Sequence, residues 1–268
     1  MKVRKYILLL AFLTWLAGVV PAGGQERERY HSRLLLGLTG GATVSSGIYQ
    51  YSSGPEPPNF NPIVTPGGGL TIDWRIARWL SLQNAFLYKG KGDRIDMKLW
   101  AEKFYQMLTP ESDPDFSLEG AGFIKTDIRY VEWSLCPTFV IGKSFEIGIG
   151  GFAAVGLTGK ENKDYVVSYF WDGELIEANE VKTERPVGFA LLVPTTDDPN
   201  TLSINQLDYG LCSRLGFRIG AFTLAGSVSY SLEKWEPAPS LFTEMPVTQT
   251  QNISGMVSLT FFLGKRPL

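Results

Sequence analysis

The chain has 268 residues and a formal net charge of -2, with 25 Lys and Arg against 27 Asp and Glu. This balance provides no basic field that would attract DNA or RNA, so we expect no nucleic-acid partner. The length is enough for one large or two small domains. A hydrophobic content of 44% with 19% charged residues excludes an extensively disordered chain.

The N-terminus has the three-part layout of a secretory signal peptide. Three basic residues in the first five positions precede an apolar run from Tyr6 to Val20, and small residues follow. An N-terminal membrane anchor is the alternative, but it would need about 20 apolar residues. We therefore expect residues 1–25 to be cleaved during export and residues 26–268 to form one domain.

Beyond the signal peptide, apolar and polar residues alternate with the period of two that is typical of β-strands. Eight segments have this pattern. The predicted strands cover residues 34–44, 68–75, 79–89, 126–141, 145–157, 204–219, 222–233 and 252–263.

Short and long connections alternate between these strands. The short ones are residues 76–78, 142–144 and 220–221, and the long ones are residues 45–66, 90–125, 158–203 and 234–251. Loops as long as these are uncommon inside compact soluble domains. An up-and-down barrel with short periplasmic turns and long outer loops produces this alternation.

Each predicted strand has an apolar face and a small or polar face. A soluble lipocalin-like barrel is the alternative, and it would enclose the apolar faces. Aromatic residues near the strand ends favour contact with lipid, because membrane barrels have aromatic belts at both interfaces. These aromatic residues are Trp74, Trp79, Tyr88, Tyr130, Tyr209, Tyr230 and Trp235.

We therefore predict an all-β fold: an eight-stranded antiparallel up-and-down transmembrane barrel with long extracellular loops. With a signal peptide at the N-terminus, the expected location is the outer membrane of a Gram-negative bacterium. Outer-membrane lipids are then the first expected partners, and envelope or secretion proteins are further candidates.

If the apolar faces meet lipid, seven charged residues point into the lumen. They are Asp73, Arg75, Glu132, Glu146, Asp208, Arg214 and Arg218. The interior of an eight-stranded barrel is just wide enough for side chains to fill. We expect these charges to pair, because a buried unpaired charge is costly. This predicts a plugged barrel, and a proton or ion path through Glu132 and Arg214 is the alternative.

Cys136 and Cys212 are both expected inside the barrel at similar depth. The strand between them would separate their Cα atoms by about 10 Å, which is too far for a disulfide, so we predict two separate thiols. Two cysteines without a CxxC motif or a nearby His make a poor metal site. The only histidine, His31, precedes the first strand on the expected periplasmic side. We predict no enzymatic activity, no cofactor and no metal.

Two features in the long loops could contact a partner. One is a short amphipathic helix that begins at Asp96 and stops at Pro110; we expect it to cover the barrel mouth, and partner binding is the alternative. The other is a hairpin with its turn at Asp172-Gly173, which we expect to extend the wall above the membrane. The loop residues expected to make such contacts are Trp100, Phe104, Phe170 and Trp171.

Three segments resemble the PorT-like outer-membrane barrel family of Bacteroidota. They read YVEWSLCPTFVIGKSFEIGIGGFAAVG from Tyr130, DYGLCSRLGFRIGAFTLAGSVSYSL from Asp208, and VSLTFFLG from Val257. Ser134 stands where that family tends to have proline. The resemblance implies an outer-membrane barrel that usually has no assigned activity, although the namesake serves a secretion system. A secretion or envelope-assembly component, and a small transporter or pore, are therefore alternative functions.

Overall fold

The structure is a computed structural model, and it describes residues 33–51, 60–99, 101–102, 115–142, 144–190, 202–233 and 247–263. The predicted signal peptide and His31 lie outside the described residues.

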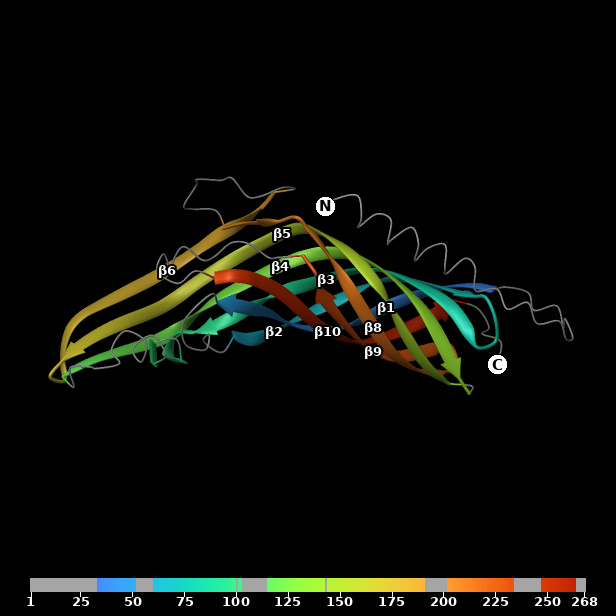
Figure 1. Cartoon of the computed structure of the whole chain (residues 1–268), viewed down its shortest axis with the longest axis horizontal. Helices are drawn as coiled ribbons and strands as arrows, with labels where there is room; N and C mark the ends of the chain where they lie inside the picture. The colour runs from blue at the N-terminus through green and yellow to red at the C-terminus, as the bar shows by residue number, and fades with distance from the viewer. Residues whose placement is uncertain are drawn as a thin grey trace, which may run out of the picture. The chain divides into compact units, whose positions relative to one another are not determined.

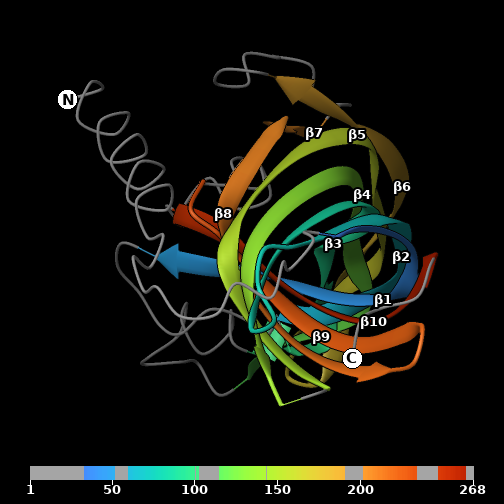
Figure 2. The same ribbon diagram turned by 90° about the vertical axis from the view of Figure 1, so that its right-hand side faces the viewer.

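The described chain forms ten β-strands, and eight of them close a ring (Figures 1 and 2). The strands are β1 (Arg33–Tyr51), β2 (Phe60–Arg75), β3 (Leu80–Asp96), β4 (Phe116–Ile141), β5 (Phe145–Trp171), β6 (Glu174–Ala190), β7 (Leu202–Asn205), β8 (Leu207–Ile219), β9 (Phe222–Ser231) and β10 (Val247–Leu263). The ring runs β1-β2-β3-β4-β5-β8-β9-β10 and closes by antiparallel pairing of β10 with β1. The predicted eight-stranded antiparallel barrel is confirmed, and most strands are longer than the alternation alone indicated.

The apolar face of each barrel strand points outward and the polar face points inward. On β10, Val257 and Leu259 are exposed, whereas Ser258 and Thr260 are buried. Inside the barrel, the hydroxyl group of Thr39 lies 2.6 Å from that of Thr71 and 2.9 Å from that of Thr260, which links three neighbouring strands. This is the reverse of a soluble barrel, and it is the distribution that outer-membrane barrels have. The lipocalin-like alternative is therefore wrong.

Exposed aromatic side chains lie on the outer surface near the strand ends. Trp79 stacks on Phe139 with the ring centroids 5.9 Å apart, beside a short turn. Most of the predicted belt residues in the described chain are exposed, as at Trp74 and Tyr209. The prediction for Tyr130 is wrong, because this side chain is fully buried in the barrel. It is two residues from Glu132, and residues two apart on a strand share a face.

The short and long connections lie at opposite ends of the barrel. At the long-loop end, β4 and β5 continue past the ring and pair with each other from Phe116 and Trp171 downward. β6 adds a third strand to this sheet through a turn in which Asp172 has φ 50° and Gly173 has φ 76°. Two successive positive φ values define the hairpin turn that Asp-Gly favours, so the predicted hairpin is confirmed.

The end of β6 leaves this extended sheet and lies against the inner side of β5. There β6 pairs with the short strand β7 in parallel, with Val187 opposite Leu202 and Phe189 opposite Ile204. β5 has glycines at positions 156 and 159, and a Cβ atom at Gly156 would overlap the ring of Phe189. The small residues of β5 therefore make the space that β6 occupies.

A helical turn follows β3 at residues 97–99 and 101–102. Its first N–H groups are capped, since Asp96 Oδ1 accepts a hydrogen bond from the Lys98 backbone N–H at 3.0 Å. Met97 and Ala101 are buried with Leu118 and Tyr165 of the extended sheet. No helix in the described part of the chain is long and apolar enough to cross a membrane.

Candidate functional site

One group of charges in the lumen is centred on Lys91; we call Lys89, Lys91, Glu132 and Asp208 the Lys91 cluster. The Lys91 ammonium lies 2.6 Å from Asp208 Oδ2 and 3.2 Å from Glu132 Oε2. Lys89 lies 2.6 Å from the other oxygen of Glu132. All four side chains are at most 2% exposed. Two cations and two carboxylates thus neutralise each other across the barrel, from β3 and β4 to β8.

Aromatic rings complete the surroundings of Lys91. Its ammonium lies 4.4 Å from the ring centroid of Phe152 and 5.3 Å from that of Tyr130. Both distances are in the range of cation–π attraction. Buried Tyr130, which belongs inside the barrel rather than in the lipid belt, therefore helps to hold this cation.

Sequence reasoning missed Lys89 and Lys91. The predicted strand ended at residue 89, whereas β3 continues to Asp96. The signal was present, because Gln83, Lys89, Lys91 and Asp93 share the inward face at a spacing of two residues. Residues 90–125 were predicted as a long connection instead, so the inward positions beyond residue 89 were not considered.

A second group of charges lies nearer the short turns; we call Asp73, Arg75, Glu146, Arg214 and Arg218 the Arg218 cluster. Arg218 pairs with Glu146, and its Nη2 lies 3.7 Å from Asp73 Oδ2. Arg214 Nη2 lies 3.8 Å from Glu146 Oε2, and Arg214 donates a hydrogen bond to Gln83. Arg75 is buried two residues from Asp73 on β2. The structure thus brings the seven charged residues chosen from the sequence into two groups.

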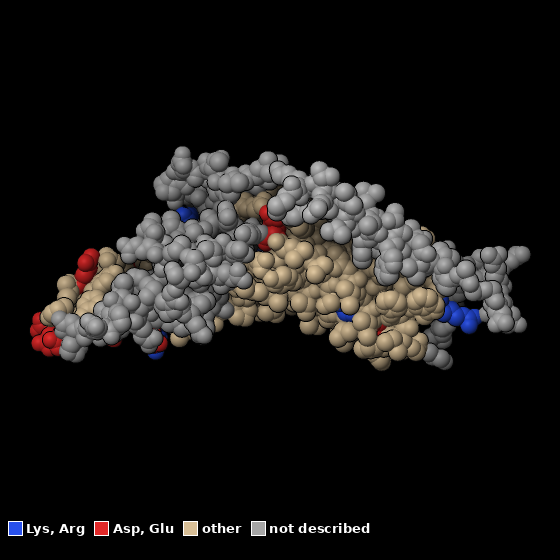
Figure 3. All heavy atoms as spheres, in the orientation of Figure 1, with Lys and Arg blue, Asp and Glu red and all other residues tan. Residues whose placement is uncertain are grey.

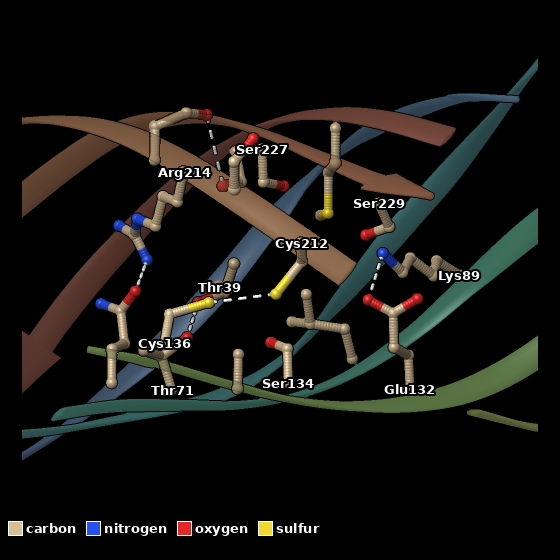
Figure 4. A pocket seen from close by; sticks show the side chains of 17 residues that line it. Thr39, Thr71, Lys89, Glu132, Ser134, Cys136, Cys212, Arg214, Ser227 and Ser229 are labelled. Carbon is tan, nitrogen blue, oxygen red and sulfur yellow. Dashed lines mark hydrogen bonds and ion pairs between the residues drawn. The ribbon is translucent and has the colours of Figure 1, made fainter. Parts of the chain in front are cut away.

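A small cavity separates the two clusters (Figure 4). Its volume is about 40 Å³, and its lining includes Thr39, Gln83, Ser227, Ser229 and Met256. A cavity of this size has room for only a few water molecules. In the described lumen, the charged side chains of the two clusters therefore lie on either side of this cavity.

The two cysteines face each other across this cavity (Figure 4), and their sulfur atoms are 3.1 Å apart as free thiols. Both cysteines are free thiols, as predicted, but the expectation that their side chains are too far apart to meet is wrong. Gly150 of β5 pairs with Cys212 and stands between the two cysteine strands. The estimate of the separation assumed a flat sheet, whereas an eight-stranded barrel curves tightly and glycine places no side chain between the sulfurs.

Apolar residues cover the lumen at the long-loop end. Val187 and Ile204, from β6 and β7, pack with Ile128, Tyr130 and Phe152 in one buried cluster, and Phe189 is packed against it. This covering lies directly above the Lys91 cluster, because Tyr130 and Phe152 contact both.

The tip of the β5–β6 hairpin combines apolar and acidic side chains. Trp171, Leu175 and Ile176 are 47%, 57% and 62% exposed, and Phe170 is partly buried. Figure 3 shows acidic residues gathered at this far end, and the exposed residues there include Glu174. The other two residues chosen as loop contacts, Trp100 and Phe104, lie outside the described residues.

Lower on the same hairpin, Lys163 lies 3.6 Å from Glu161, which also pairs with Arg185. Burial lowers the pKa of the Lys163 ammonium group, although the Glu161 carboxylate opposes this effect. At a tilt of about 45° and a rise of about 3.3 Å per residue, a band about 25 Å tall is crossed in roughly ten residues. Counted along β5 from Phe145, next to the short turn, Glu161 and Lys163 therefore lie beyond the apolar band that contacts the membrane.

The described residues contain no group of three or more His, Cys, Asp or Glu side chains placed to hold a metal ion. The Lys91 cluster has two cations and two carboxylates, whereas the Arg218 cluster has three arginines and two carboxylates. Such an arrangement can hold the barrel wall in register and obstruct the lumen.

No family model matches the chain, and no curated protein matches it in sequence. Solved structures do resemble it. The attachment invasion locus protein Ail of Yersinia pestis is 11% identical with a TM-score of 0.35, and the match covers 85% of this chain and 98% of Ail. Neisserial surface protein A is 7% identical with a TM-score of 0.36, over 86% of this chain and 98% of that protein. The outer membrane protein OprG from Pseudomonas aeruginosa is 14% identical with a TM-score of 0.34, over 87% of this chain and 97% of OprG. Identities and TM-scores this low say nothing about activity, and the conclusions below depend on the chain's own geometry.

Proposed function

We propose that the chain is a non-enzymatic integral protein of a Gram-negative outer membrane, with a plugged barrel and a partner-binding hairpin outside the membrane. The observation that supports the first part is the set of charged side chains inside the barrel. The Lys91 cluster and the Arg218 cluster occupy two levels of the described lumen, and a cavity of about 40 Å³ lies between them. We infer that these side chains obstruct the lumen at both levels.

The proposal includes the features of the sequence that concern export and kinship. Residues 1–25 act as a cleaved signal peptide, and the protein is a PorT-like barrel of Bacteroidota. N-terminal sequencing of the mature protein tests the first point, and a start far from residue 26 would contradict it. If the protein belongs to this family, secretion or envelope assembly is the alternative function. That function predicts stable co-purification with other envelope proteins.

Conductance tests the plug directly. In planar bilayers, the purified barrel should give no current steps, while a large porin measured in the same bilayers serves as the positive control. Regular ohmic steps from this protein would refute the plug and favour the transporter or pore. In that event, a change of ion selectivity on Glu132→Gln would place the path along the predicted Glu132–Arg214 line.

The hairpin tip is the proposed contact surface. It projects from a sheet that continues beyond the ring, and it exposes Trp171, Leu175 and Ile176, of which Leu175 and Ile176 lie on opposite faces of the hairpin. Exposed apolar clusters rimmed by charge are typical of binding sites. Trp100 and Phe104 are proposed as additional contacts on the neighbouring loop. The triple variant Trp171→Ser, Leu175→Ser, Ile176→Ser should lose envelope proteins that co-purify with the wild type, while it keeps the folded barrel.

A further inference from the structure

The lumen contains a pair of thiols that neither cluster uses. Cys136 on β4 and Cys212 on β8 are buried, and their sulfurs are 3.1 Å apart (Figure 4). Cys136 lies between Leu135, which pairs with Gly151, and Thr138, which pairs with Gly148. It therefore stands in one row with Gly150 and Cys212.

Glycine at position 150 is what permits this approach. A Cβ atom at Gly150 would overlap the carbonyl oxygen of Leu135 and would lie 2.9 Å from Cys136 Cα. β4 and β5 therefore come together more closely here than side chains allow. With no side chain between them, the two cysteine side chains lean over β5 and meet.

We propose that Cys136 and Cys212 are a site of covalent modification: they form a disulfide that ties β4 to β8 across β5 inside the barrel. An S–S bond is about 2.05 Å long and joins Cα atoms no more than about 7 Å apart, so the sulfurs must approach by about 1 Å and β4 and β8 must close any Cα separation beyond that limit. The oxidant is a protein or small-molecule disulfide of an oxidising compartment, such as the periplasm. The two thiols lose two protons and two electrons as their S–S bond forms, and the oxidant's disulfide is reduced to two thiols.

The disulfide would lie next to the seam between β5 and β8. β5 and β8 are neighbours in the ring, but β6 and β7 lie between them in the chain. Their pairing extends only from Phe145 to Val155 on the β5 side. A covalent link from β4 to β8 secures this seam independently of the β5–β8 hydrogen bonds.

The test is alkylation of the full chain after export and folding in detergent. Protein is denatured in a thiol-alkylating reagent, with or without prior reduction, and its intact mass is measured. We expect the unreduced wild type to carry no label, both as isolated and after treatment with oxidised glutathione. The reduced wild type should carry two labels. Two labels without reduction, both before and after oxidised glutathione, would overturn the proposal.

A matched control moves one thiol along the same inward face. In the variant Cys136→Ser, Ser134→Cys, the thiol shifts by about 7 Å along the strand, so it should be labelled without reduction. If this variant is protected as well, the disulfide is not specific to the geometry and the proposal fails. Reduction should also lower the temperature of the gel-mobility transition in the wild type, while it leaves that of the variant Cys136→Ser, Cys212→Ser unchanged.

Discussion

Replacing Lys91 by methionine should destabilise the barrel strongly, because the change leaves a buried carboxylate without its cation. Asp208 is 2% exposed, and Lys91 lies 2.6 Å from its Oδ2. Glu132 keeps Lys89 at 2.6 Å, so only one carboxylate loses its partner. Breaking a buried ion pair costs about 3–5 kcal/mol. We expect the lower end, about 3 kcal/mol, because a single charge is orphaned and methionine can pack against Phe152.

The assay is equilibrium unfolding by denaturant in lipid vesicles, followed by tryptophan fluorescence and by heat-modified gel mobility. The matched control is Lys160→Met, which removes a pair with Glu184 at 3.3 Å whose side chains are 53% and 60% exposed. An exposed pair contributes about 0–1 kcal/mol. The double variant Lys91→Met, Asp208→Asn should recover much of the loss, because it removes the orphaned charge. Equal effects of Lys91→Met and Lys160→Met, or no recovery in the double variant, would refute the buried network.

Three further predictions concern the lipid face, the covering strand and the hairpin. Val257→Arg should lower the free energy of unfolding in vesicles by about 2–4 kcal/mol, because the side chain of Val257 is 65% exposed on the face that meets acyl chains. Ile219→Arg, beside a short turn, should lower it by only about 0–1 kcal/mol. Equal losses would contradict the membrane orientation. Gly156→Ala should cost about 1–3 kcal/mol by overpacking against the Phe189 ring, while Gly226→Ala, where a Cβ meets nothing within 4 Å, should be neutral in the same unfolding assay. The triple serine variant of the hairpin tip should change the free energy of unfolding by less than about 0.5 kcal/mol, and a larger loss would show that the tip is structural.

The sequence by itself determined the fold class and the face on which each side chain lies. The period of two divides every strand into an outward and an inward side, so Val257 and Thr260 are assigned correctly without coordinates. Asp-Gly at 172–173 likewise determined the hairpin turn, because both residues tolerate positive φ. Tyr130 was placed wrongly because its position near a strand end was given more weight than the strand face that it shares with Glu132.

Only the tertiary structure decided which inward residues meet. The alternation along a strand shows that a side chain points into the barrel, but not at what height along the barrel axis it lies. That height depends on the stagger between strands when the barrel closes. Lys91 finds Asp208, and Cys136 finds Cys212, across strands far apart in the sequence. The position of Val187 and Ile204 over the lumen could not be predicted either. When the barrel closes, β8 pairs with the edge of β5, and β6 then leaves β5 and pairs with β7.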